Sequence, residues 1–134
     1  DGAPSQYGDT GLALSCDQQI ARRVTIFARY GMADPNVREI EYFWSCGLQL
    51  EDPLPSREHD VFAFASAGSI ISGDFRKIDD PKNASSETIF ETYYLVAINE
   101  IFSITPNFQV CIYPDADLKS PTAIVFGARC LLLF

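Results

Sequence analysis

The chain has 134 residues, with 10 Lys and Arg against 18 Asp and Glu, a formal net charge of -8 at pH 7, and 47% hydrophobic residues. This composition excludes a disordered polyelectrolyte, and the acidic balance argues against nucleic-acid binding because few cations could neutralise phosphates. No stretch reaches the roughly 18 consecutive apolar residues of a transmembrane helix. On length, we expect residues 1–134 to form one unit with no second domain.

The first three predicted elements are β-strands, because apolar and polar or small residues alternate along them. The pattern covers 12–20, 24–30 and 40–51. Successive strand side chains point to opposite faces, so each segment offers one apolar and one largely polar row. The segment 40–51 is the clearest, and its length suits a bilayer-spanning strand of about 9–11 residues better than a soluble strand of about 5–6.

Four more strands follow, and no helical pattern competes with them. Residues 61–71 are small and apolar on both sides, while 90–98, 104–112 and 124–134 again alternate. Short turns separate strands near 21–22 and 99–102, and long polar loops cover 31–38, 73–86 and 114–121, with a connection of intermediate length at 51–60. Short turns on one side and long loops on the other are typical of outer-membrane barrels.

Alternation alone leaves open which face meets lipid. The apolar rows carry aromatic residues that would form a membrane-interface girdle: Tyr30, Tyr42, Trp44, Tyr94 and Phe134. The polar rows carry mid-strand charges that suit a wet wall: Arg29, Glu41, Glu91 and Arg129. These features favour a transmembrane barrel whose apolar rows face lipid. The alternative is a soluble β-sandwich or β-barrel ligand-binding module with an inward apolar core.

The residues that usually carry metal, redox or catalytic chemistry form no motif. Cys16, Cys46, Cys111 and Cys130 are too evenly spread for a CxxC pair, and the lone His59 completes no metal or catalytic set. Disulfides stay possible, but thiols acting as small hydrophobes on a packed face are favoured. We expect no metal, no cofactor and no enzymatic activity.

Four segments, in order, resemble the carbohydrate-selective outer-membrane porin family (OprB type). They are FARYGMADPNVREIEYFWSCGL (27–48), ETIFETYYLVAI (87–98), ITPNFQVCIYP (104–114) and FGARCLLLF (126–134). The chain departs from the family pattern at its cysteines 46, 111 and 130, and at Leu131 and Leu133, where polar lumen-facing residues would be expected.

The resemblance implies an all-β, antiparallel, up-and-down transmembrane barrel of about sixteen strands, of which this chain would supply about seven C-terminal ones. It further implies a passive channel for small sugars in the outer membrane of a Gram-negative-type bacterium, in contact with outer-membrane lipids and assembled as a homotrimer. Seven strands cannot close a barrel of the known bacterial kind, so we expect these residues to belong to a longer chain.

The polar rows also supply the candidate solute contacts. Charged and amide groups can hydrogen-bond sugar hydroxyls, and aromatic rings can cover the C–H faces of a sugar ring. The predicted pore-lining residues are Arg29, Glu41, Phe43, Glu91, Tyr93, Gln109 and Arg129.

Overall fold

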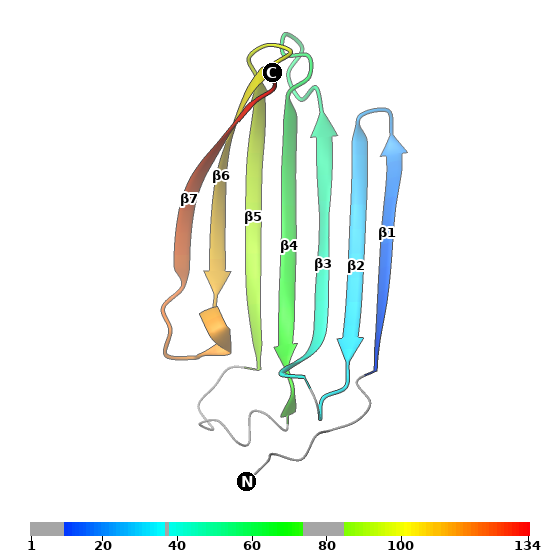
Figure 1. Cartoon of the computed structure of the whole chain (residues 1–134), viewed down its shortest axis with the longest axis vertical. Helices are drawn as coiled ribbons and strands as arrows, with labels where there is room; N and C mark the ends of the chain where they lie inside the picture. Colours follow the sequence, from blue (N-terminus) through cyan, green and yellow to red (C-terminus); the bar gives the residue numbers. More distant parts are fainter. Residues whose placement is uncertain (1–9, 37, 74–84) are drawn as a thin grey trace.

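The computed structural model describes residues 10–36, 38–73 and 85–134, and its seven strands form one antiparallel sheet in chain order (Figure 1). The strands are β1 (Gly11–Ala21), β2 (Val24–Ala33), β3 (Ile40–Glu51), β4 (Val61–Ile71), β5 (Ser86–Ala97), β6 (Phe102–Ile112) and β7 (Ala123–Leu132). A short 3-10 turn, η1 (Pro114–Ala116), follows β6. The predicted all-β, up-and-down arrangement is confirmed. No helix within the described residues is long and apolar enough to span a membrane.

The register gives the two faces of the sheet a simple numbering. Almost every cross-strand pair joins two even-numbered or two odd-numbered residues, as in the row Cys16, Ala28, Cys46, Ser66, Phe90, Val110 and Ile124. Paired residues lie on the same face of a sheet. We therefore call the two sides the even face and the odd face.

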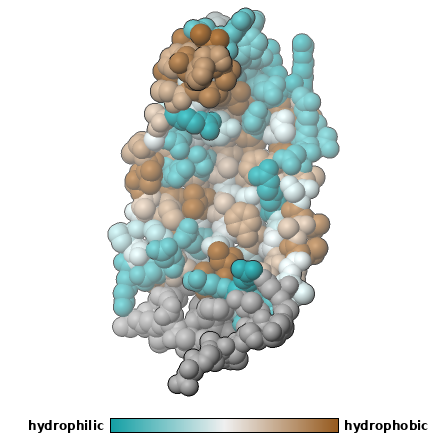
Figure 2. Space-filling view, viewed as in Figure 1, coloured by the Kyte–Doolittle hydropathy of each residue, from teal (hydrophilic) through white to brown (hydrophobic). Residues whose placement is uncertain are grey.

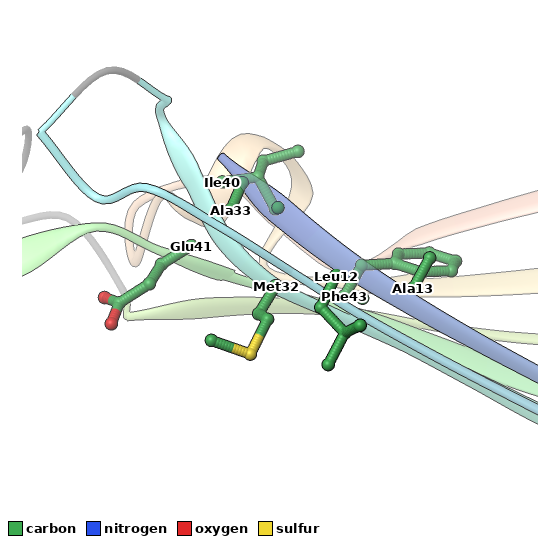
Figure 3. Close-up of a pocket in the computed structure, with 9 residues that line it drawn as sticks. Leu12, Ala13, Met32, Ala33, Ile40, Glu41 and Phe43 are labelled. Carbon is green, nitrogen blue, oxygen red and sulfur yellow. The ribbon is translucent and has the colours of Figure 1, made fainter. Parts of the chain in front are cut away.

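Two irregularities interrupt this numbering: a register shift between Gln19 and Ala21 at the end of β1, and a bulge at the start of β3. Ile40 pairs with Ile71 whereas Tyr42 pairs with Ile70, so Glu41 is the extra residue. A bulge re-aims the side chains beside it. Figure 3 shows Glu41 pointing to the same side as Met32, and Ile40 pointing to the opposite side. Strict alternation places Glu41 on the odd face, and the bulge corrects that placement.

The connections lie at two ends of the sheet, which we call the short-turn end and the long-loop end. The short-turn end holds the links 22–23, 52–60 and 98–101, and the C-terminus lies there (Figure 1). The long-loop end holds the links 34–39, 72–85 and 113–122, of which 37 and 74–84 lie outside the described residues. The predicted short turns at 22–23 and 98–101 lie at one end, but the link 52–60 at that end has nine residues, more than the six of 34–39 at the other, so connection length separates the two ends only in part.

A buried carboxylate fastens the short-turn end. Asp60 is completely buried, and its oxygens accept hydrogen bonds from Arg57 Nε at 2.8 Å, from the Tyr94 hydroxyl at 2.9 Å and from the Ala97 backbone N–H at 2.9 Å. The Arg57 guanidinium holds the pKa of the Asp60 carboxyl below its usual value, against the opposing effect of burial. We call these four residues the Asp60 clasp; it joins the β3–β4 connection to the end of β5.

The sheet is a single layer with almost no interior of its own. Among the described residues, the only buried hydrophobic ones are Ala63 and Ala116, whereas Leu14 is 62% and Phe126 79% exposed on the even face. Figure 2 shows one face on which hydrophilic and hydrophobic residues are mixed, with hydrophobic ones gathered at the end where the C-terminus lies. A water-soluble sheet would have to cover such apolar residues with a second layer.

Candidate pore-lining surface

Charge is sorted between the two sides of the sheet, with one exception. All charged residues of the seven strands have odd numbers: Asp17, Arg29, Glu41, Glu51, Glu87, Glu91 and Arg129. Except for Glu41 in the bulge, they lie on the odd face, so the even face carries no other strand charge. Lipid-facing rows of a membrane barrel exclude charge, whereas lumen-facing rows are polar. The odd face is therefore the candidate pore-lining surface.

A hollow of about 440 Å³ on the odd face of β5, β6 and β7 brings three predicted contacts together. Glu91, Tyr93 and Arg129 line it, with Thr105, Asn107, Gly127 and Ala128. Gln109, another of the predicted contacts, is the cross-strand partner of Glu91. This pair is the next on the odd face after the pair of Tyr93 and Asn107. The hollow thus offers hydrogen-bond donors and acceptors from three neighbouring strands.

Within this hollow, the two charged groups remain available for a solute. Asn107 Nδ2 donates a hydrogen bond to Glu91 Oε1 at 3.3 Å. In the part of the chain that the structure describes, the Arg129 guanidinium makes no hydrogen bond or ion pair, with Glu91 or any other residue. A carboxylate and a guanidinium that do not neutralise each other can both bind the hydroxyls of one polar solute.

Arg29 lies in a different setting, on β2. Its guanidinium is 3.5 Å from an Asp17 oxygen, its Nε donates to the Ser15 hydroxyl at 3.4 Å, and it sits 4.9 Å from the centre of the Phe27 ring. Three strand spacings, about 14 Å, separate β2 from β5. The structure therefore does not bring Arg29 to the hollow, and its donors already have protein partners.

Phe43 lies one row of the odd face along from Arg29, toward the long-loop end and away from the hollow on β5–β7. It lines a hollow of about 360 Å³ together with Ala13, Gly31 and Ile40 on the odd face, and Figure 3 shows its ring on the side opposite Met32. Glu41 borders the same hollow, but its carboxylate lies against the Tyr42 hydroxyl on the other side of the sheet.

Four of the predicted interface aromatics lie on the even face, toward its two ends, and Phe134 follows the end of β7. Tyr30 stacks on Tyr42 with ring centres 6.2 Å apart and pairs with Trp44 toward the long-loop end, whereas Tyr94 and Phe134 lie at the short-turn end. Tyr94 is in register with Leu50 through Phe62, eight residues along β3 from Tyr42. Eight residues span about 27 Å along a strand, so the two groups of aromatics lie at well-separated ends of the strands, as the two aromatic girdles of a membrane barrel do.

The sequence reasoning missed Asn107, Gly127 and Asp17 as members of these clusters. Asn107 and Asp17 fall on the polar rows, so their face could be predicted, but the partner of each depends on the register between strands. Gly127 has no side chain whose chemistry could draw attention to it. No group of three or more His, Cys, Asp or Glu within the described ranges could hold a metal ion.

The family model for the carbohydrate-selective porin, OprB family, matches residues 2–134. Porin AaxA of Chlamydia abortus is 25% identical over 120 residues, which are 90% of this chain and 26% of that protein. Porin AaxA of Chlamydia pneumoniae is 26% identical over 121 residues, which are 90% of this chain and 27% of that protein. The chain therefore spans about a quarter of the length of these curated relatives.

The fold agrees with a solved porin. The high-pH structure of Pseudomonas putida OprB superposes with a TM-score of 0.83 at 20% identity, covering 91% of this chain and 34% of that chain. The matching family is one of porins rather than of enzymes, and it places the chain in the outer membrane of Gram-negative bacteria. The chain belongs to the carbohydrate-selective porin, OprB family.

Proposed function

We propose that the chain forms part of the wall of a passive outer-membrane channel through which small sugars and similar polar solutes diffuse. The observation that carries the proposal is the sorting of charge: apart from Glu41 in the bulge, the strand charges lie on one face, while the other face is mainly apolar and carries exposed residues such as Leu14 and Phe126. A charged side chain in hydrocarbon is costly, and a water-filled lumen stabilises it. The even face then meets lipid, and the odd face lines the passage.

The single-layer architecture supports this proposal over a soluble binding module. A β-sandwich buries the apolar rows of two sheets against each other. Here the described strands form one sheet, and Phe126 on its even face is 79% exposed. Hydrocarbon would cover this face without a second protein layer.

The free edges of the sheet point to a larger assembly. β1 and β7 each pair with one neighbour only within the described strands. Unpaired backbone groups cost several kcal/mol each in lipid, so both edges need partners. We propose that further strands of a longer chain close a barrel of about sixteen, with residues 1–134 as one continuous segment of it. The homotrimer that the family resemblance implies, in contact with outer-membrane lipids, is part of the same proposal.

In this channel, the odd face supplies the solute contacts. Glu91, Tyr93, Gln109 and Arg129 act around the hollow on β5–β7. Arg29 and Phe43 line other parts of the wall, and the carboxylate of Glu41 is turned away from it. Transport of this kind needs hydration to be replaced by protein groups, and neither covalent chemistry nor a cofactor.

Neighbouring cysteines on β3 test which face meets water. Two single-cysteine forms of the complete barrel are made, one keeping Cys46 on the even face and the other carrying Ser45→Cys on the odd face. A membrane-impermeant maleimide is expected to label position 45 and to leave position 46 unlabelled in intact membranes, and to label both after unfolding. Labelling of position 46 with protection of position 45 would contradict the proposed channel.

The solute is tested separately in planar bilayers. The complete protein is expected to give stepwise ion conductance that small neutral sugars reduce reversibly. If no sugar reduces the conductance, the protein is still a channel, but the proposal that sugars are its solutes is contradicted.

A further inference from the structure

The side chain of Asn107 occupies space that only a glycine leaves free. Asn107 on β6 pairs directly with Gly127 on β7. A Cβ atom built at Gly127 would overlap with Asn107 Oδ1 and would lie 3.3 Å from Asn107 Cγ. The amide therefore lies across the β7 backbone at Gly127, with its oxygen toward this strand.

The other end of the same amide reaches back to β5. Asn107 Nδ2 donates to Glu91 Oε1, although Tyr93 and not Glu91 is the register partner of Asn107. Turning the amide over would aim its oxygen at the carboxylate, and two acceptors repel each other. The orientation of Asn107 is thus set by Gly127 on one side and by Glu91 on the other.

We propose that Asn107, seated on Gly127, is a positioning residue that sets the affinity of the hollow for its solute. This inference rests on the proposed channel function. Asn107 donates a hydrogen bond to Oε1 of Glu91, whereas Oε2 of Glu91 accepts no hydrogen bond from the described residues. The hollow then presents a fixed acceptor on β5 and the guanidinium of Arg129 on β7. A solute with several hydroxyl groups can donate to the first and accept from the second.

The test uses Gly127→Ala, which changes neither a charge nor a polar group. The new methyl group meets the far end of a side chain and not the backbone, so we expect the barrel to fold and Asn107 to be displaced. Gly31→Ala is the matched control on the same face, because its Cβ would meet only Leu12 O at 3.8 Å. Open-channel conductance and the dissociation constant for block by a neutral sugar are measured in planar bilayers.

We expect Gly127→Ala and Asn107→Ala each to weaken sugar block about five-fold, the typical worth of one hydrogen bond, with open-channel conductance nearly unchanged. Because both substitutions act through the amide of Asn107, sugar block of the double variant should be no weaker than sugar block of Asn107→Ala alone. Unchanged block in Asn107→Ala overturns the inference, as does an additive loss in the double variant. If Gly127→Ala does not fold, Asn107→Ala alone decides. Absence of sugar block in the wild-type channel would instead overturn the proposed solute.

Discussion

The ring of Phe27 on β2 covers Gly47 on β3: a Cβ atom at Gly47 would lie 2.7 Å from Phe27 Cε1 and 2.6 Å from the backbone oxygen of Phe64. Aromatic rings that lie over a glycine of the neighbouring strand help to pin the register of a sheet. This contact lies on the odd face beside Arg29, whose guanidinium also rests on Phe27. Packing and polar contacts on this part of the wall therefore depend on each other.

Gly47→Ala is expected to destabilise the barrel by about 1–3 kcal/mol, because the new methyl group meets a backbone atom that cannot move aside. The unfolding midpoint in urea, followed by the gel shift between folded and unfolded porin, measures this change. Gly31→Ala should leave the midpoint unchanged. Equal midpoints for the two variants would show that the Phe27 contact does not constrain the sheet.

Adjacent residues on β7 separate lipid from lumen. Phe126→Lys places a charge on the apolar even face and is expected to destabilise the barrel, because a lysine on the lipid face costs up to about 2–4 kcal/mol, depending on its depth in the bilayer. Val125→Lys, on the odd face, should fold normally and shift the ion selectivity toward anions. The folded fraction in lipid vesicles and the reversal potential in a salt gradient provide the two readouts. A normal folded fraction for Phe126→Lys would contradict the assignment of the faces.

The two arginines should contribute unequally to solute binding. Arg129→Gln is expected to weaken sugar block about five-fold, because its donors have no protein partner among the described residues. Arg29→Gln should have less effect on sugar affinity, because the Arg29 donors already bind Asp17 and Ser15. Concentration-dependent block of single channels compares the two directly. A larger loss of sugar affinity in Arg29→Gln than in Arg129→Gln would indicate that the solute binds near β2 and would contradict the proposed site.

The Asp60 clasp gives the barrel a defined response to acid. Because the pKa of the folded Asp60 carboxyl is lowered, its contribution to stability is complete above about pH 4 and is lost as the pH falls through the folded value. Asp60→Asn should destabilise the protein by about 1–3 kcal/mol at neutral pH. The thermal unfolding midpoint of the wild type should fall toward that of the variant below pH 4. Parallel midpoints at all pH values would exclude this role of the clasp.

The face of most residues could be predicted from the sequence, because two-residue alternation is a direct consequence of strand geometry. Trp44 and Phe126 illustrate this, since both lie on the apolar row that alternation predicted. The end of the sheet at which each connection lies follows from the up-and-down order of the strands, whereas length alone would misplace the nine-residue link 52–60.

Contacts between strands could not be predicted in the same way. The pairing of Arg29 with Asp17, and of Asn107 with Glu91, requires the register of neighbouring strands, which alternation leaves undetermined. The bulge inserts Glu41 as an extra residue of β3 opposite β4. Neither a glycine nor a proline stands at this position to mark the bulge in the sequence. The burial of Asp60 depends on Arg57 and Tyr94, of which Tyr94 lies 34 residues away in the chain.

Each strand of the sheet pairs only with the strands before and after it in the chain. Closing such neighbouring segments costs little loop entropy, so the sheet can grow by adding one hairpin at a time. The β7 and β1 edges are then the places where further hairpins of a barrel would add, and each added hairpin would pair the backbone groups of the strand beside it. A chain built in this way can fold stepwise, without first gathering distant segments into a collapsed intermediate.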